Sequence, residues 1–303
     1  MSTQISAPWG VALVVGGALL MAAKGIVTKW LYRSGIQLEA LLLLRALMSL
    51  PLIWGWAWWR GELVRVMAAP RAVLSAAALG GLSGYYVGTW CDFRALQLID
   101  ASLERVLLFT YPAMVVLARA LWARRAPQLR EVAAVSVTYV GVLLAVGGFD
   151  TELWRANQTG ALLVLSSAAL FAGYLFANEY AASRIGSVGF LVVAATSAAV
   201  GLTGHFLVTS TSAALSLPPQ VWWSVLLMTA FTNVVPLFML SAGVGQLGAA
   251  RAAVLTSVGP PATLFLAWWW LGESMHGLQW VGSLLCVSGV LILEVGRKRT
   301  AVP

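Results

Sequence analysis

Long apolar runs separated by short polar connections constrain this chain more than any other feature of its sequence. A helix needs roughly 20 apolar residues to cross a hydrocarbon core of about 30 Å. Because a chain inside lipid must satisfy its backbone polar groups internally, each such run is predicted to be a transmembrane helix. The sequence therefore predicts an all-α integral membrane protein with ten transmembrane helices, near residues 9–31, 38–58, 72–97, 101–122, 129–147, 159–180, 188–208, 220–241, 248–271 and 277–296.

The composition supports this fold class and leaves little room for anything else. Of the 303 residues, 60% are hydrophobic and 10% are charged, whereas soluble domains carry about 25% charged residues. The longest polar connections are predicted at Phe149 to Thr159 and at Thr209 to Gln220. Both are short, so we expect function to lie within the helices.

The formal net charge of +8 is interpreted as a topology signal facing anionic lipid rather than as a nucleic-acid site, because no basic stripe interleaved with aromatic residues is present. The N-terminal run continues past a cleavable length, so it is predicted to be a retained first span. The positive-inside rule then places both termini in the cytoplasm of a bacterial inner-membrane protein. The basic residues on the side of the termini are Arg60, Arg65, Arg71, Arg124, Arg125, Arg130, Arg184, Arg251, Arg297, Lys298 and Arg299, against Lys29, Arg33, Arg94, Arg105 and Arg155 opposite.

An internal repeat divides the chain into residues 1–150 and residues 151–303. An offset of 148 residues superposes Pro112 on Pro260, Trp122 on Trp270, and the Gly-Val-Leu run at 141–143 on that at 289–291. Each half holds five predicted helices, which is an odd number, so the second half must enter the membrane inverted. Two inverted five-helix repeats around a central cavity are the architecture of many secondary transporters.

With these features the chain resembles the drug/metabolite transporter superfamily, specifically the ten-helix EamA-type exporters. The resemblance covers nearly the whole chain and rests on the five-plus-five repeat, on Gly259-Pro260-Pro261 followed by Leu271-Gly272-Glu273, and on Gly282 and Gly289. The first half departs from the pattern, with Arg124-Arg125 in the place of Gly272-Glu273. Within the superfamily the chain looks most like the aromatic amino acid exporters.

Prolines inside equivalent helices are predicted to bend them. A proline removes an amide donor and clashes with the carbonyl four residues back, so Pro112, Pro260 and Pro261 should free the carbonyls of Leu108, Thr256 and Ser257. One such proline is more often a packing kink. A symmetric pair favours a position beside a cavity, since paired interruptions in matching helices mark a transporter's midplane site.

The first helix of each half carries one polar stripe. At an offset of 150, Gly17, Lys24 and Thr28 match Ser167, Tyr174 and Asn178, and this spacing puts each set on one helical face. Lys24 lies well inside its span, where it either faces the cavity or extends its long stem to the surface. Arg45 is interpreted as structural, paired with Asp92 or Glu104.

Aromatic and polar residues of the third and eighth predicted helices complete the candidate site. Gly80, Gly84 and Gly88 form a small-residue packing face, and the repeat places Thr232, Asn233 and Pro236 opposite Gly84, Tyr85 and Gly88. An apolar, aromatic pocket with a few polar anchors is typical of small-molecule sites. The full candidate substrate site is Lys24, Tyr85, Tyr86, Trp90, Tyr111, Phe171, Tyr174, Asn178, Thr232, Asn233, Thr256 and Ser257, with Pro112, Pro236, Pro260 and Pro261 as helix-bending residues.

Several tempting motifs do not fit their context. The GxGxxG match at 243–248 joins two apolar helices, whereas the dinucleotide motif must follow a strand. The chain has no Walker-type run, and His205, His276, Cys91 and Cys286 have no partner spacing. No cofactor, metal site or enzymatic activity is therefore expected.

These patterns predict a secondary transporter that exports a small organic molecule by alternating access and functions as a monomer among membrane lipids. The resemblance implies amino acids, aromatic ones first. Uniport is favoured because none of the 11 acidic residues is predicted at mid-span, where proton-coupled carriers place a titratable carboxylate. The alternatives are a drug, nucleoside or other metabolite exporter of the same fold, a channel, and an intramembrane enzyme.

Overall fold

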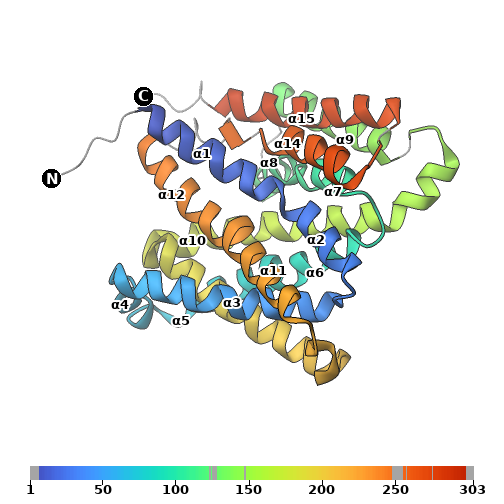
Figure 1. Ribbon diagram of the computed structural model, residues 1–303. Coiled ribbons are helices and arrows are strands. Elements are labelled where there is room, and N and C mark those ends of the chain that lie inside the picture. Colours follow the sequence, from blue (N-terminus) through green and yellow to red (C-terminus); the bar gives the residue numbers. More distant parts are fainter. Residues whose placement is uncertain are drawn as a thin grey trace.

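The computed structural model describes residues 7–122, 124, 128–146, 148–247, 255–256, 258–274 and 276–297, and within these residues it is helical, with no strand. Figure 1 shows the helices packed side by side as a bundle. The elements are α1 (Ala7–Ala22), α2 (Lys24–Arg33), α3 (Leu38–Trp59), α4 (Leu63–Met67), α5 (Arg71–Gly80), η1 (Gly81–Gly88), α6 (Thr89–Ala95), α7 (Ala101–Leu108), α8 (Tyr111–Trp122), α9 (Leu129–Val146), α10 (Thr151–Thr209), η2 (Ser212–Leu215), α11 (Pro219–Thr229), η3 (Ala230–Val234), α12 (Val235–Leu247), α14 (Gly259–Leu266), η4 (Ala267–Leu271) and α15 (Gly277–Arg297).

Six helical stretches among the described residues are long and apolar enough to cross a membrane. They are Pro8–Arg33, Leu38–Trp59, Ala101–Trp122, Leu129–Val146, Thr151–Thr209 and Pro219–Leu240. Many large apolar side chains on the outside of the bundle are exposed, Trp58 and Trp122 by more than three quarters. In a lipid environment such side chains are solvated by hydrocarbon, so the chain is a multi-pass membrane protein.

The longest helix, α10, has 59 residues, about 90 Å at 1.5 Å per residue. It is not straight, because Gly186 has φ 76° and ψ 158°, a conformation that only glycine adopts readily. Figure 1 shows α10 turning back on itself, from green at the right to orange-yellow at the bottom. The helix therefore forms two antiparallel arms joined at Gly186, which correspond to the predicted runs at 159–180 and 188–208.

The polar connection predicted from Phe149 to Thr159 is wrong in its extent. Residues from Thr151 onward are helical, because the Asp150 side chain caps the first turn of α10: its Oδ1 accepts hydrogen bonds from the amides of Glu152 (2.9 Å) and Leu153 (3.0 Å). Such an N-cap satisfies amide donors that have no partner within the helix. The helix thus begins about two turns earlier than hydropathy alone indicates.

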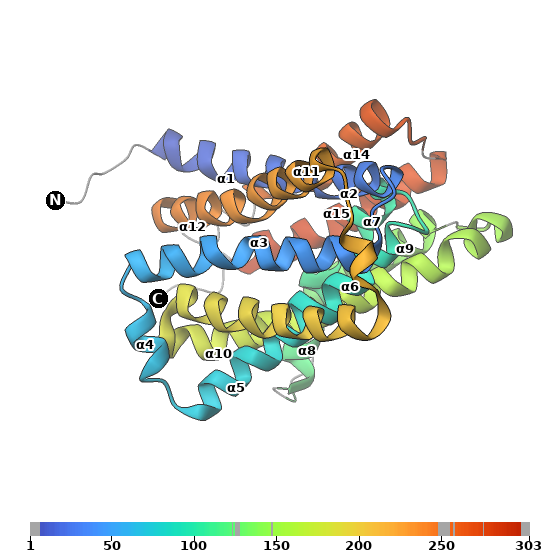
Figure 2. The ribbon, with the colours of Figure 1, turned by 60° about the horizontal axis from the view of Figure 1, so that its bottom comes forward.

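Distant parts of the sequence pair closely in the bundle. Helix α1 packs along α12, α9 along α15, and η1 along α10, and Figures 1 and 2 both show α1 beside α12. Glycines allow the close approach. The small-residue face predicted in the third helix is confirmed as a packing face, since a Cβ added at Gly84 would lie 2.6 Å from Tyr174 Cβ and one at Gly80 would lie 2.6 Å from Ala177 Cβ.

Candidate functional site

A small cavity lies inside the bundle between α3, the third predicted span (α5, η1 and α6), the second arm of α10, and the η3 and α12 segments. Its volume is about 50 Å³, enough for a few water molecules. Five of its lining residues carry polar side chains: Arg45, Ser49, Tyr85, Thr89 and Asn233. The remaining lining residues are Leu42, Ala46, Ile53, Leu191, Ala195, Ala198, Leu202, Val234 and Leu237.

Two π-helical segments each carry one of the polar residues that line this cavity. Segment η1 contains Tyr85 and η3 contains Asn233, and these two residues are matched by the repeat offset of 148. A π-helical turn widens the helix and leaves the regular hydrogen-bonding pattern, and such turns are frequent at functional sites. The Thr89 hydroxyl donates to the Gly84 carbonyl five residues back (3.4 Å), as this wider turn allows.

Arg45 is the charged group of the cavity, and it was interpreted from the sequence as structural. The predicted pairing with Asp92 or Glu104 is wrong: Arg45 Nη2 donates to Asn233 Oδ1 (3.3 Å), and its guanidinium carbon lies 4.9 Å from the Phe93 ring centroid. Its Nε is buried with no hydrogen-bond partner among the described residues. The position of Arg45 inside an apolar run of the sequence could have identified it as a cavity residue, because charged residues within membrane spans usually face the bundle interior or a cavity.

Lys24 takes the partners that had been assigned to Arg45. Its Nζ lies 2.5 Å from Asp92 Oδ2 and 3.4 Å from Glu104 Oε1. Asp92 is 4% exposed and Glu104 is fully buried. Lys24 therefore forms a buried ionic cluster between α2, α6 and α7, and it is not among the residues that line the cavity.

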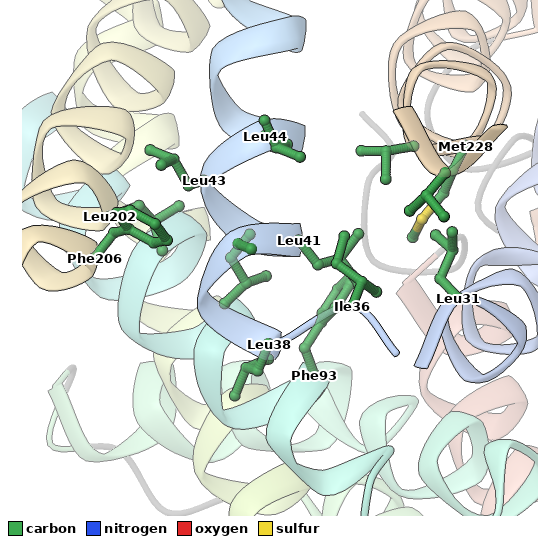
Figure 3. Close-up of a cluster of buried hydrophobic side chains, with 14 residues drawn as sticks. Leu31, Ile36, Leu38, Leu41, Leu43, Leu44, Phe93, Leu202, Phe206 and Met228 are labelled. Atoms are coloured by element: carbon green, nitrogen blue, oxygen red, sulfur yellow. The ribbon is translucent and has the colours of Figure 1, made fainter. Parts of the chain in front are cut away.

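Two buried apolar clusters supply most of the apolar lining of the cavity. At the end of the bundle that carries Gly35, a cluster formed by α2, α3, α6, α10 and α11 includes Leu38, Leu41, Phe93 and Phe206, and Figure 3 shows Phe93 beside Leu38, Leu41 and Ile36. At the end that carries Gly61, the cluster includes Ile53, Ala57, Leu191, Val192 and Ala195. Along α3, Arg45 and Ser49 therefore lie between the two clusters.

Four of the predicted aromatic residues form a continuous series of rings that leads to the cavity. Ring centroids are 4.8 Å apart for Tyr85 and Tyr174, 5.4 Å for Tyr174 and Phe171, and 5.1 Å for Phe171 and Tyr111. Aromatic pairs at these distances attract beyond their burial of apolar area. Only Tyr85 of the four lines the cavity itself.

The other predicted residues lie around this core or outside it. The Tyr86 hydroxyl is 3.0 Å from His205 Nδ1, and the Trp90 ring lies 6.0 Å from the His205 ring. Thr232 donates to the Met228 carbonyl of its own helix (2.8 Å). Asn178 lies on α10 with Oδ1 buried and without a partner among the described residues. Thr256 is half-buried, and Ser257 lies outside the described residues.

The prolines sit beside helix interruptions, but not at the cavity. A turn at Phe109 and Thr110 separates α7 from α8, so Pro112 is the second residue of α8, and Pro260 is likewise the second residue of α14. Pro260 and Pro261 line a separate apolar groove of about 490 Å³, between α7, α14, η4 and α15. Because Phe265, Trp268 and Leu284 of this groove are more than half exposed on the outside of the bundle, we interpret it as facing lipid.

Glu273, from the Leu-Gly-Glu motif, joins the two halves at the end that carries Gly35. Its carboxylate accepts hydrogen bonds from the amides of Ala101 (3.0 Å) and Ser102 (3.1 Å) and from the Ser102 hydroxyl (2.8 Å), and it pairs with Lys29 Nζ (3.0 Å). Burial alone would raise the pKa of Glu273, but the Ala101 amide, the Lys29 charge and the Ser102 hydroxyl outweigh it and hold the pKa below its usual value of 4.5.

Comparisons with known proteins agree with this architecture. The family model described as "EamA-like transporter family" matches residues 8–147 and residues 158–295. An "Uncharacterized transporter YcbK" of Bacillus subtilis (strain 168) is 29% identical over 284 residues, which is 90% of this chain and 88% of that protein. A solved structure described only as "Crystal structure of protein" superposes with a TM-score of 0.63 at 18% identity, over 98% of this chain and 100% of the other, which shows a shared fold. The chain belongs to the EamA-like transporter family and is a membrane transporter rather than an enzyme.

Proposed function

We propose that this protein exports amino acids, aromatic ones first, across the bacterial inner membrane by alternating access around the cavity at Arg45, Tyr85 and Asn233. The proposal rests on a cavity with polar lining residues inside an apolar bundle. A series of aromatic rings continues from the cavity residue Tyr85. A transported molecule with an aromatic side chain and a polar backbone matches both parts. The resemblance of the sequence to the aromatic amino acid exporters supports the same substrate class.

We further propose ten membrane spans. Gly186 divides α10 into two arms, α5 joins α6 across η1, α11 joins α12 across η3, and η4 continues α14. The pair α1 and α2 and the pair α7 and α8 each form one apolar stretch. Counting the arms and the joined stretches gives ten crossings. Both termini would then lie on one side, and Figure 1 has α1 beginning and α15 ending at the side of the view where α4 lies.

Helix starts and helix contacts that match between the two halves, residues 1–150 and 151–303, support an inverted repeat. We propose this repeat as the source of alternating access. Helix α8 begins at Tyr111 and α14 at Gly259, which differ by the repeat offset of 148. Contacts are matched as well: a Cβ added at Gly17 would lie 3.3 Å from the Pro236 carbonyl, and one at Gly88 would lie 3.6 Å from the Ser167 carbonyl. The family model also matches each half separately.

The small size of the cavity and the two apolar clusters beside it support alternating access. Ligand sites usually hold about 300 Å³ or more, so an amino acid needs a wider cavity than the one of about 50 Å³ seen here. Opening the apolar cluster at one end while the other stays closed would admit the substrate from one side at a time. Of the residues predicted from the sequence, Tyr85 and Asn233 line this cavity, and Tyr174, Phe171 and Tyr111 continue the series of rings from Tyr85. We propose these residues, with Arg45 added, as the substrate site.

Uniport is the transport mode that the charges favour. The described residues that line the cavity include no carboxylate. The buried carboxyl groups of Asp92 and Glu104 each contact Lys24 through one oxygen, and the other oxygen of each is buried without a partner among the described residues. A carrier that moves protons with its substrate needs a titratable group whose partner changes during transport. The protein would therefore act as a monomer driven by the substrate gradient itself.

The test uses proteoliposomes loaded with a panel of labelled amino acids, without a pH gradient or a membrane potential. We expect saturable downhill flux and counterflow that are greatest for aromatic amino acids. Ala195→Phe would fill the cavity and should abolish flux, whereas Ala169→Phe, at an exposed position of the same helix, should not. Flux that requires a proton gradient would contradict uniport, and equal flux in both variants would contradict the site.

The main alternative is an exporter of drugs, nucleosides or other metabolites with the same fold. The apolar aromatic series would accept many flat molecules, so a thermal-shift screen over these classes separates the possibilities. Stabilisation by a nucleoside or a cationic drug, with none by amino acids, would favour the alternative.

A further inference from the structure

Arg45 carries hydrogen-bonding capacity that the described residues do not use. A guanidinium has five N–H donors and no acceptor. The polar contact of Arg45 is one bond to the neutral Asn233 amide oxygen at 3.3 Å, and its Nε is buried without a partner among the described residues. A buried cation in this state is costly, and a planar anion placed in the cavity would remove that cost.

The neighbouring carboxylate of Asp92 forms no salt bridge with Arg45, although its Oδ1 is buried without a hydrogen-bond partner among the described residues. Asp92 Oδ2 is engaged by Lys24 at 2.5 Å, and the fully buried Phe93 ring contacts both cations: the Lys24 ammonium lies 5.6 Å and the Arg45 guanidinium 4.9 Å from its centroid. Phe93 thus borders both the ionic cluster around Lys24 and the cavity around Arg45. No salt bridge joins Arg45 to an acidic residue among those that the structure describes.

We propose that Arg45 binds the carboxylate of the transported molecule, so the substrate class is small organic acids with an apolar or aromatic body, amino acids among them. This inference rests on the proposed function and refines it. Arginine matches a carboxylate through two parallel N–H···O bonds. The Asn233 amide contacts Arg45 and orients it. The cavity lining offers no acidic group to an ammonium, so the carboxylate is recognised and the amino group is dispensable.

The test compares three molecules that share one aromatic ring. Phenylalanine carries both charges, 3-phenylpropionate keeps only the carboxylate, and phenethylamine keeps only the ammonium. In proteoliposomes with labelled phenylalanine, 3-phenylpropionate should compete within a few-fold of unlabelled phenylalanine, and phenethylamine at least about tenfold more weakly, because a charge-assisted bidentate pair is lost. Equal competition by phenethylamine would overturn the proposal.

Variants separate recognition from folding. Arg45→Gln should lose the preference for 3-phenylpropionate, and Arg45→Lys should retain part of it as a point charge. Arg60→Gln is the matched control, because it removes an exposed arginine from the last turn region of the same α3 helix. A variant that keeps the full preference without a cation at position 45 would contradict the carboxylate site.

A binding measurement keeps this test independent of transport. The midpoint of thermal unfolding in detergent should rise with 3-phenylpropionate for the wild type and for Arg60→Gln, since a ligand that binds only the folded state stabilises it, and it should not rise for Arg45→Gln. If the wild type transports no phenylalanine but shows this shift, the proposed substrate fails while the carboxylate site stands. If 3-phenylpropionate produces no shift in the wild type, the carboxylate site is wrong.

Discussion

Lys24 Nζ lies 2.5 Å from Asp92 Oδ2 and 3.4 Å from Glu104 Oε1, so one ammonium contacts two buried carboxyl groups on different helices and can balance the charge of one of them. We expect Lys24→Met to be the most destabilising change in this cluster, by about 3–5 kcal/mol, since it leaves buried acidic groups without a counterion. Glu104→Gln preserves the shorter pair and should cost about 1 kcal/mol. Thermal unfolding in detergent measures both.

A triple variant provides the control for that ranking. Lys24→Met combined with Asp92→Asn and Glu104→Gln removes the charges together, and a neutral cluster should recover much of the stability lost in Lys24→Met alone. If Lys24→Met costs no more than Glu104→Gln, the ionic cluster does not stabilise the fold in the way described.

The Glu273 contacts predict a pH-dependent contribution to stability. The folded-state pKa of Glu273 is lowered from 4.5, so its contribution is fully present above about pH 4.5 and is lost as the pH falls through the folded-state value. Glu273→Gln should therefore lower the unfolding midpoint at pH 7, and the difference from the wild type should shrink below pH 4.5. A difference that stays constant down to pH 3 would show that the charge of Glu273 has no part in the effect.

Close packing of η1 on α10 predicts a strong effect of one methyl group. A Cβ at Gly84 would lie 2.6 Å from Tyr174 Cβ, so Gly84→Ala must separate the two helices and should destabilise the protein by about 1–3 kcal/mol. Gly173→Ala is the matched control on α10, where an added Cβ meets nothing within 4 Å. The expected result is a large drop in unfolding midpoint for the first variant and none for the second.

Membrane orientation can be tested with single cysteines, because Cys91 and Cys286 are buried. Arg155→Cys lies on the exposed first turns of α10 and Ala68→Cys lies after α4 at the other end of the bundle. With both termini cytoplasmic, an impermeant maleimide added to intact cells should label position 155 and spare position 68. The reverse pattern would invert the topology.

The lengths of the apolar runs predicted most of the helices. They did not predict a helix end that depends on a capping side chain. The ends of α3, of α9 and of the stretch formed by α7 and α8 together agree with the predicted ranges within one residue, because hydropathy changes sharply there. The start of α10 was missed because the Asp150 cap holds polar residues in a helix that hydropathy assigns to a loop.

The cavity was predicted in part. Tyr85 and Asn233 were found because the repeat matched them, and both line the cavity. The partners predicted for Arg45 belong instead to Lys24, since the choice depends on which helices become neighbours across 68 to 188 residues of sequence. A sequence pattern along one helix contains no information about that choice.

Glu273 has no acidic counterpart in the sequence of the first half, because the repeat offset of 148 places Arg125 at the matching position. A pseudo-symmetric carrier with identical halves would have inward-facing and outward-facing forms of similar energy. Here Glu273 accepts hydrogen bonds from Ala101 and Ser102 and pairs with Lys29, so these contacts stabilise one end of the bundle. A contact that is present in one conformation only shifts the resting population toward that conformation. The same substrate should consequently show unequal half-saturation concentrations on the two sides of the membrane. This kinetic asymmetry would arise without any external energy source.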